Sequence, residues 1–407
     1  MAGYRTTVLR HKRTPAVLGG APAFSAPIYV TRPRLPNESD LFDLIRGLLR
    51  SRWITNDGAL VRALEERLRS RLGAGFCAAI CNGTTALQVA LRSLGIDGEV
   101  ITTPFTFPAT VHAITWMGLT PVFCDIDPAS YNIDADAIDA AATGRSRAVL
   151  PVHVFGNPCD VNAIERVTAR HGLRTVYDCA HAFGVSYRGR PITDWGDLSI
   201  LSLHATKLFH TVEGGAIVGR TAALLERVAL LRNFGIVNEE EVRGIGINGK
   251  LSELHAAMGL AMLPSIDDEI AQRRQLTERY LQRIDGIPGI RLQRFPVDMV
   301  RNYAYFTIEV DTDAFGLSRD QLHKALRAEN IMVRKYFSPL ASANHTYRDL
   351  PTADPSYLPN AHRLSTRILS LPLYGDLQLD DVDRIIDAVL ALQAAASGVR
   401  RTVSTGQ

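Results

Sequence analysis

The sequence predicts an α/β protein with a mainly parallel sheet, followed by a smaller α+β domain. Between about residue 60 and residue 260, segments with helical periodicity alternate with short β-branched runs, as βαβ units require. A charged helical segment at residues 267–284 then leads into a second group of strands and helices. The chain of 407 residues, 46% of them hydrophobic, is long enough for one large domain plus a smaller one.

The elements of the alternating region follow from this periodicity. Strands are expected at residues 76–80, 99–103, 120–124, 148–152, 174–178, 198–203 and 215–218. Helices are expected at residues 59–71, 85–94, 108–117, 134–141, 162–171, 222–232 and 252–263. Together they predict a seven-stranded sheet with helices between its strands.

The second group of elements begins after the connecting helix. Ser318, with Gln321 three residues later, forms the pattern of a capping box and predicts a helix start. Strands are expected at residues 303–310, 331–334 and 367–371, and a final helix at 379–396. The expected division is an N-terminal arm (1–35), a large domain (36–265), a connector helix with a small domain (266–398) and a disordered tail (399–407).

Charge and composition argue against several classes of protein. The 45 basic side chains nearly balance the 42 acidic ones, and a net charge of +3 does not predict a nucleic-acid partner. No apolar run of the signal-peptide kind follows the basic N-terminus, and no segment approaches the roughly 20 apolar residues of a membrane span. Cys77 and Cys81 have no second pair of ligands nearby, so no metal site is expected. We expect a soluble, cytoplasmic protein.

Lys207 is the residue that most strongly suggests a chemistry. It follows a short apolar run at residues 198–203 and precedes a Gly-Gly pair, so a partly desolvated pocket could lower the pKa of its amine. A neutral lysine amine can form a Schiff base, and pyridoxal phosphate is the commonest partner in that chemistry. The alternative is a solvent-exposed lysine in a loop, and only further matching residues can decide between the two.

A phosphate-binding segment is predicted where a strand meets the next helix. Asn82, Gly83, Thr84 and Thr85 would present backbone N–H groups and hydroxyls to an anion at the N-terminus of that helix. The alternative is an ordinary helix cap by Asn82 or Thr84. Ser202 could also bind the phosphate, or it could serve only the backbone at the end of its strand.

Three further residues complete a candidate cofactor site. Asp178 ends a predicted buried strand, where open α/β sheets bind ligands, and a protonated pyridine nitrogen would supply the cationic partner that a buried carboxylate needs. His181 could pack against the cofactor, and Phe107 could stack on its ring. The alternatives are a capping aspartate, a core histidine and a core aromatic residue.

The motifs resemble those of the DegT/DnrJ/EryC1/StrS group of sugar aminotransferases, which have the fold-type I architecture of pyridoxal phosphate-dependent transferases. The resemblance covers roughly residues 35–390, and ordered motifs at compatible spacing are more specific than any single one. The segments that carry it are residues 82–87, 104–110, 178–184, 202–207, 213–215 and 246–257.

The resemblance implies a role for each of the candidate residues. Lys207 would form the Schiff base, Asp178 would bind the pyridine nitrogen, and Phe107 would stack on the ring. Gly83, Thr84, Thr85 and Ser202 would lie at the phosphate, and His181 beside the cofactor. Asn248 would reach the phosphate from the neighbouring subunit of a homodimer with shared active sites. Gly249 and Lys250 depart from the family pattern, in which an aromatic residue and often Arg occupy these positions.

The resemblance also implies a substrate. His204 to Lys207, followed by Glu213-Gly214-Gly215, is similar to family members that act at the C-4 position of a sugar. The expected reaction is transfer of an amino group from L-glutamate to a nucleotide-linked, dTDP-type 4-keto-6-deoxyhexose. The residues expected at the substrate are Trp53, Thr55, Asn56, His204 and Tyr336. The alternatives are amination of a C-3 keto sugar or a cyclitol, and a non-catalytic regulatory protein that binds pyridoxal phosphate.

Overall fold

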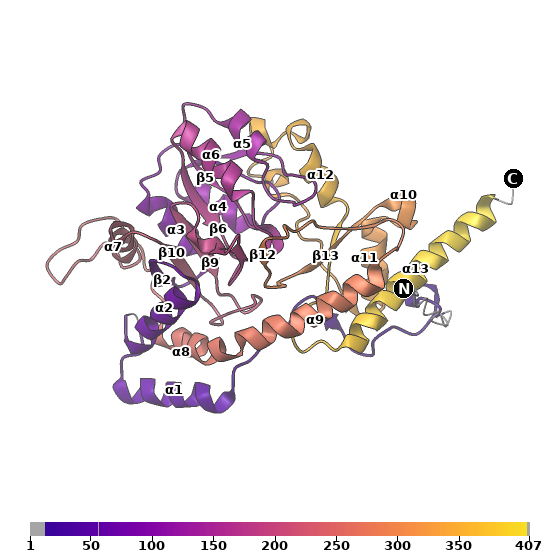
Figure 1. Ribbon diagram of the computed structural model, residues 1–407, viewed down its shortest axis with the longest axis horizontal. Coiled ribbons are helices and arrows are strands. Elements are labelled where there is room, and N and C mark those ends of the chain that lie inside the picture. Colours follow the sequence, from indigo (N-terminus) through magenta and orange to yellow (C-terminus); the bar gives the residue numbers. More distant parts are fainter. Residues whose placement is uncertain (1–12, 56, 405–407) are drawn as a thin grey trace.

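The computed structural model describes residues 13–55 and 57–404. A large lobe surrounds the central sheet, a smaller lobe carries the C-terminal helix, and α9 (Ile266–Ile284) runs from one lobe to the other (Figure 1). The capping box predicted at Ser318 and Gln321 is present at the start of α11 (Arg319–Ala328).

The central sheet has seven strands, as predicted, in the order β2-β10-β9-β6-β5-β3-β4. Only β10 is antiparallel to its neighbours, so the sheet is mainly parallel. The strands are β2 (Phe76–Ile80), β3 (Glu99–Thr102), β4 (Thr120–Phe123), β5 (Ser146–Leu150), β6 (Arg174–Asp178), β9 (Leu198–Ser202) and β10 (Gly215–Gly219).

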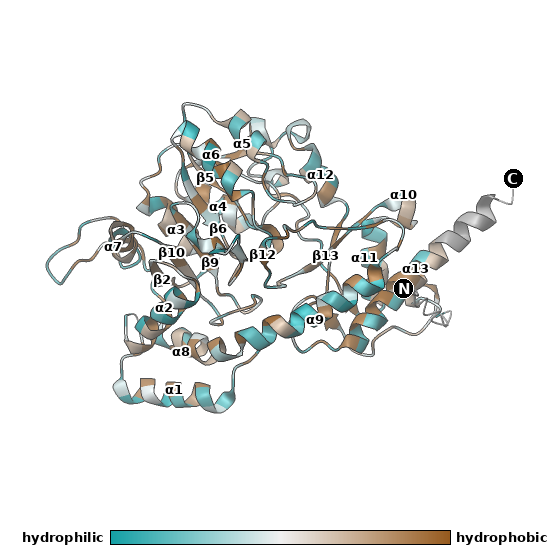
Figure 2. Cartoon of the chain, in the orientation of Figure 1, coloured by the Kyte–Doolittle hydropathy of each residue, from teal (hydrophilic) through white to brown (hydrophobic). Residues whose placement is uncertain are grey.

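Helices cover both faces of this sheet, because successive strand residues point to opposite sides and both sides are apolar. One face packs on α3 (Gly83–Ser93), α4 (Pro108–Trp116) and α7 (Ala222–Leu231). The other packs on α2 (Ala59–Arg71), α5 (Ala135–Ala141), α6 (Val161–His171) and α8 (Glu253–Met262). Figure 2 shows hydrophobic residues along the strands and hydrophilic ones on the outer sides of the helices.

The small lobe contains an antiparallel sheet of β11 (Ile290–Leu292), β13 (Phe306–Val310) and β15 (Ile368–Leu371). Its core also includes residues of α9, α11 and α13 (Leu379–Ser404). Helix α13 extends to Ser404 and so includes part of the tail at residues 399–407 that was expected to be disordered. Ala394, Ala395 and Ala396 have high helix propensity and favour this continuation. Residues 405–407 lie outside the described chain. None of the described helices combines the length and apolar character that a membrane span needs.

The described part of the N-terminal arm packs on the small lobe. β1 (Ile28–Tyr29) pairs in parallel with β14 (Ile331–Met332), and Phe24 is buried in the small lobe's core. The buried Glu329 carboxylate accepts the N–H groups of Ala16 and Ala23, each at 2.7 Å, and forms an ion pair with Arg13. The arm is therefore held by main-chain pairing and by one buried acid.

Several elements differ from the sequence-based expectation. Strand β5 begins and ends two residues earlier than predicted, because Pro151 follows it and cannot donate to the ladder. Helix α1 (Glu38–Ser51) was not predicted. Neither were α10 (Thr312–Phe315), α12 (Pro359–Ser365) and the small sheet of β7 (Ser186–Tyr187), β8 (Arg190–Pro191) and β12 (Met299–Val300).

Candidate active site

The candidate site lies at the edge of the central sheet where its parallel strands end. Asp178 ends β6 and Ser202 ends β9, and parallel neighbours bring their carboxyl ends to one edge. A cavity of about 360 Å³ opens there. The predicted residues that line it are Gly83, Thr84, Phe107, Asp178, His181, Ser202, His204, Lys207 and Tyr336. The structure thus brings together most of the residues singled out in the sequence.

One wall of the cavity is the N-terminus of α3. Asn82 caps this helix, since its Oδ1 accepts the N–H of Thr85 at 2.8 Å. The first amides of a helix have no partner within it, and the helix dipole favours an anion at that end. A Cβ atom added to Gly83 would lie only 3.0 Å from the Cβ of Ser202. The glycine therefore lets the Ser202 side chain lie directly beside the start of α3. The cap by Asn82 and the binding of an anion by the first amides of the helix are compatible.

Asp178 is a buried carboxylate at the base of the cavity, with 4% of its surface exposed. Its Oδ1 accepts the N–H of Ala180 at 3.0 Å, and its Oδ2 accepts the Thr110 hydroxyl at 2.9 Å. Burial raises the pKa of this carboxyl, against the effect of these hydrogen bonds and of the Lys207 charge. Among the described residues Asp178 forms no ion pair. Its buried carboxylate is therefore suited to pair with a cationic ring nitrogen.

Lys207 lies in the loop between β9 and β10 and is half-buried. Burial lowers the pKa of its amine, while Asp178 and Tyr336 act in the opposite direction. A lowered pKa increases the neutral, nucleophilic fraction of the amine near neutral pH, as Schiff-base chemistry requires.

Aromatic rings form the other walls. Phe107, the residue before α4, lines the cavity with 59% of its surface exposed, so a face of its ring is accessible. His181 stacks nearly parallel to Phe155 and Phe337, with ring centroids 6.1 and 6.0 Å away. Its Nδ1 accepts the N–H of Phe155 at 3.2 Å, and burial together with Lys207 lowers its pKa. His181 is therefore a neutral imidazole with its proton on Nε2.

His204 and Tyr336, both predicted at the substrate, also border the cavity. His204 Nε2 lies 3.6 Å from a Glu213 carboxylate oxygen, and its Nδ1 lies 2.8 Å from the Thr206 hydroxyl. Burial raises the pKa of Tyr336, so its phenol stays protonated and able to donate a hydrogen bond.

The remaining predicted residues do not line this cavity within one chain. The methyl group of Thr85 faces Gly249, and Asn248 is exposed with its Oδ1 accepting from the Lys250 amine at 2.7 Å. Trp53 borders a separate hollow of about 450 Å³ beside Glu253. Thr55 is exposed, and Asn56 lies outside the described residues. The roles of these residues remain predictions. No group of three metal-ligating side chains occurs within residues 13–55 and 57–404.

Sequence reasoning assigned no role to Thr110, Tyr305 or Phe337. Thr110 lies in α4, four residues after Thr106, and the two hydroxyl oxygens are 2.9 Å apart. The spacing of the two threonines in the motif was therefore an available signal for a hydroxyl pair behind Asp178. Tyr305 and Phe337 come from the C-terminal part of the chain and reach the cavity only through tertiary packing. No local pattern marks Tyr305, whereas Phe337 directly follows Tyr336, which the sequence placed at the substrate.

A lysine amine, a buried carboxylate and a helix N-terminus at one sheet edge are typical of a pyridoxal phosphate-dependent transferase of fold type I. The model of the DegT/DnrJ/EryC1/StrS aminotransferase family matches residues 37–390, and the chain belongs to this family. The resemblance inferred from the motifs is thereby confirmed.

Individual relatives span nearly the whole chain. It is 40% identical over 364 residues to the dTDP-4-amino-4,6-dideoxy-D-glucose transaminase of Escherichia coli, covering 89% of this chain and 98% of the relative. It is 34% identical to the spore coat polysaccharide biosynthesis protein SpsC of Bacillus subtilis (strain 168), covering 84% and 91%. The solved structure of DesI in the presence of its TDP-sugar product superimposes with a TM-score of 0.89 at 38% identity, covering 96% and 98%.

Proposed function

We propose that the protein is a pyridoxal phosphate-dependent aminotransferase that transfers the amino group of L-glutamate to the C-4 ketone of a dTDP-linked 4-keto-6-deoxyhexose. The observation that carries the proposal is the half-buried Lys207 amine at a cavity whose base is the buried Asp178, which has no ion-pair partner among the described residues. An aminotransferase needs both groups, one to move a proton and one to balance a cationic ring.

The cavity residues fit the cofactor by their chemistry. Gly83, Thr84 and Ser202 would hold its phosphate at the N-terminus of α3, where N–H groups and hydroxyls meet an anion. Asp178 would bind the ring nitrogen, and Phe107 would cover one face of the ring. When bound, pyridoxal phosphate supplies an electron-withdrawing ring that stabilises negative charge on the substrate carbon.

Lys207 is the proton carrier in this proposal. In the first half-reaction its Nζ would take the proton from Cα of glutamate and pass it to the cofactor carbon that bears the nitrogen. In the second it would carry a proton in the reverse direction, from that carbon to C-4 of the sugar. The lowered pKa of the amine supports the base role in the first step. Tyr336, His181 and Phe337 line the same cavity as the amine, and their aromatic surface would restrict the access of water.

The C-4 position and the dTDP group rest on relatives and on the Lys207 motif. The Escherichia coli relative is named for a dTDP-linked 4-amino-4,6-dideoxy sugar, and DesI was solved with a TDP-sugar product. His204 precedes Lys207 at the spacing that the sequence comparison associated with C-4 action, and its side chain borders the cavity.

A homodimer with shared sites is the proposed assembly. The segment after α7 projects from the large lobe (Figure 1), and several of its apolar side chains are exposed. They include Val242 at 66%, Ile245 at 82% and Ile247 at 41%. Large exposed apolar groups on a projecting segment favour a partner surface, and a second copy of the chain would place Asn248 at the partner's phosphate site.

Amination assays test the proposed reaction directly. The purified protein, loaded with pyridoxal phosphate, is incubated with glutamate and either dTDP-4-keto-6-deoxyglucose or its 3-keto isomer. We expect 2-oxoglutarate to form with the 4-keto sugar and NMR to locate the new C–N bond at C-4. The 3-keto isomer should react on the order of 10²-fold more slowly, because its ketone is displaced from the reacting position. Faster conversion of the 3-keto isomer would refute the C-4 assignment, and no 2-oxoglutarate with any ketone would refute an aminotransferase.

A further inference from the structure

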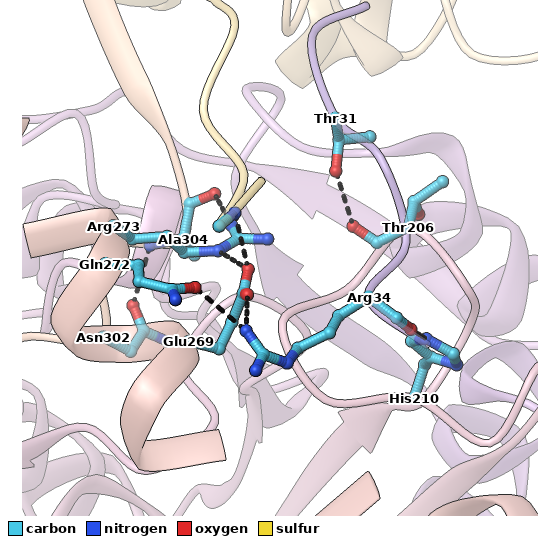
Figure 3. A network of polar contacts seen from close by, with 10 residues as sticks. Thr31, Arg34, Thr206, His210, Glu269, Gln272, Arg273, Asn302 and Ala304 are labelled. Carbon is cyan, nitrogen blue, oxygen red and sulfur yellow. Dashed lines mark hydrogen bonds and ion pairs between the residues drawn. The ribbon is translucent and has the colours of Figure 1, made fainter. Parts of the chain in front are cut away.

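The N-terminal arm crosses the loop that carries Lys207 (Figure 3). The Thr31 hydroxyl lies 3.5 Å from the carbonyl oxygen of Thr206, and His210 Nε2 donates to the carbonyl oxygen of Arg34 at 2.8 Å. Thr206 immediately precedes Lys207, and His210 follows it within the same loop. The arm therefore touches the loop on both sides of the lysine.

His210 has a fixed role in this contact. Only 2% of its surface is exposed, and its Nδ1 accepts the N–H of Val212 at 3.2 Å, so the ring proton lies on Nε2. Burial lowers the pKa of His210, against the opposing effect of the bond to Arg34, so the imidazole is neutral and Nε2–H donates to the arm. One nitrogen of the ring thus forms a hydrogen bond within the loop, and the other forms a hydrogen bond between the loop and Arg34.

The side chain of Arg34 ties the arm to the start of α9. Its Nη1 donates to Glu269 at 3.1 Å and to Gln272 at 2.9 Å. Glu269 is 1% exposed and also accepts from Arg273 Nε at 2.6 Å and from the N–H of Gly375 at 2.9 Å. Burial alone would raise the pKa of Glu269, but Arg273 and the hydrogen bonds hold it below its ordinary value. The partner of Arg34 is therefore a charged carboxylate, and both of its oxygens accept hydrogen bonds.

The same network continues to a second part of the cavity wall, at His181. Arg273 Nη1 donates to the Ala304 carbonyl at 3.2 Å, and the Ala304 N–H donates to Asn302 at 3.2 Å (Figure 3). The Asn302 amide donates in turn to the carbonyl of His181 at 2.9 Å. Thr206 and His181 both line the cavity, so one chain of contacts through Arg34 and Glu269 connects these two parts of its wall.

We propose that Arg34 is a positioning residue for Lys207, which holds the lysine loop against α9 through its carbonyl bond to His210 and its side-chain bonds to Glu269 and Gln272. The inference rests on the proposed function, because it assumes that Lys207 acts as the proton carrier. Arg34 itself is not in the cavity lining and acts only through the loop.

The first test replaces the side chain and measures the two kinetic parameters separately. Misplacement of a reacting group by about 1 Å can cost on the order of 10²-fold in rate. We expect Arg34→Ala to lower kcat by about 10- to 100-fold, with KM for glutamate within about threefold, because the substrate contacts are not altered. Both side-chain bonds of Arg34 come from one nitrogen, so Arg34→Lys should recover most of the activity.

A matched control is present in the same arm. Arg13 pairs with Glu329, another carboxylate with 1% of its side chain exposed, but this pair lies on the small lobe away from the lysine loop. Arg13→Ala should therefore leave kcat within about twofold of the wild type. An equal loss in Arg13→Ala and Arg34→Ala would overturn the proposal, since the effect would then reflect docking of the arm in general.

A second variant removes the hydrogen bond between His210 and the Arg34 carbonyl by changing the loop residue. In His210→Asn the shorter amide can still accept from Val212 N–H but cannot reach the carbonyl of Arg34. We expect it to lower kcat as Arg34→Ala does, and the double variant to lose little more than either single one. If Arg34→Ala does not fold, His210→Asn carries the test alone. Additive losses, or a kcat within twofold of wild type in either single variant, would overturn the proposal.

Hydrogen exchange supplies a measurement that needs no turnover. The Ala205 and Thr211 amides bond within the loop at 2.7 and 2.9 Å, and both should exchange faster in Arg34→Ala but not in Arg13→Ala. For these variants kcat and KM denote the rate constant and the half-saturating glutamate concentration of the glutamate half-reaction, measured without sugar, so a wrong sugar assignment would leave them unchanged. Unchanged loop exchange in Arg34→Ala would refute the positioning role even if the proposed reaction holds.

Discussion

Replacing Asp178 with asparagine removes one charge while preserving the shape of the site. In Asp178→Asn the side-chain oxygen can keep the 3.0 Å bond from Ala180 N–H. The new amide group then faces the Thr110 hydroxyl, which can turn and accept, since Thr110 and Thr106 lie 2.9 Å apart with either oxygen able to donate. The hydroxyl pair therefore accommodates the change, and the fold should be retained.

The magnitude follows from the burial of the carboxylate. Removing one partner of a buried ion pair costs about 3–5 kcal/mol, because the other charge is left without compensation. Each factor of ten in rate corresponds to about 1.4 kcal/mol, so kcat should fall by about 10²- to 10³-fold if most of this loss falls on the transition state. Cofactor affinity should also fall, since Asp178 forms no other ion pair among the described residues.

Single-turnover conversion of glutamate to 2-oxoglutarate at saturating pyridoxal phosphate measures this loss separately from cofactor binding. Asp160→Asn is the matched control, because Asp160 caps α6 through the Ala163 N–H at 3.0 Å and asparagine caps helices equally well. The control should keep wild-type rates and melting temperature. A rate for Asp178→Asn within twofold of wild type would refute the role assigned to Asp178.

Three further predictions concern Lys207. Lys207→Ala should abolish single-turnover transamination while the melting temperature and some cofactor binding persist; retained turnover would contradict the central assignment. In competitive acetylation of the cofactor-free protein, Lys207 should titrate below exposed lysines because burial lowers its pKa. Asp178→Asn should lower this midpoint further, since the carboxylate raises the pKa of Lys207 against the effect of burial. Mixing Lys207→Ala with Asn248→Ala should restore about a quarter of wild-type sites in a randomly mixed two-fold dimer; no recovery after verified exchange would argue against shared sites.

The large lobe was predictable because its sheet is buried on both faces. Such strands are continuous apolar runs, and all seven were found with their order along the chain. The two-residue strands β1 and β14 were not identified as a pair, because a strand at residue 28 meets its partner at residue 331. Pairing over such a distance leaves no local pattern in either segment. Helix α1 was missed although Asn37 caps it and Glu38 and Asp40 occupy its first turn.

The site was predictable to the extent that its residues stand at strand ends. Asp178 and Ser202 end neighbouring parallel strands, so chain order and strand direction alone place them together. The arm contacts could not be predicted in this way. Arg34 and Glu269 are far apart in the sequence, and an arginine in a loop carries no mark of a buried partner. Their meeting depends on how the arm and α9 cross, which only tertiary packing determines.

The two glycines at the end of the lysine loop allow close packing that other residues would prevent. Gly215 is the first residue of β10, as predicted, and Gly214 is the last residue of the Lys207 loop. A Cβ at Gly215 would lie 2.6 Å from the backbone of Asn82, and one at Gly214 would lie 2.1 Å from the Thr211 hydroxyl. Both positions require close approach of backbone and side chain rather than a special dihedral angle. The pair therefore holds the end of the Lys207 loop against the cap of α3, and so joins the lysine to the proposed phosphate site.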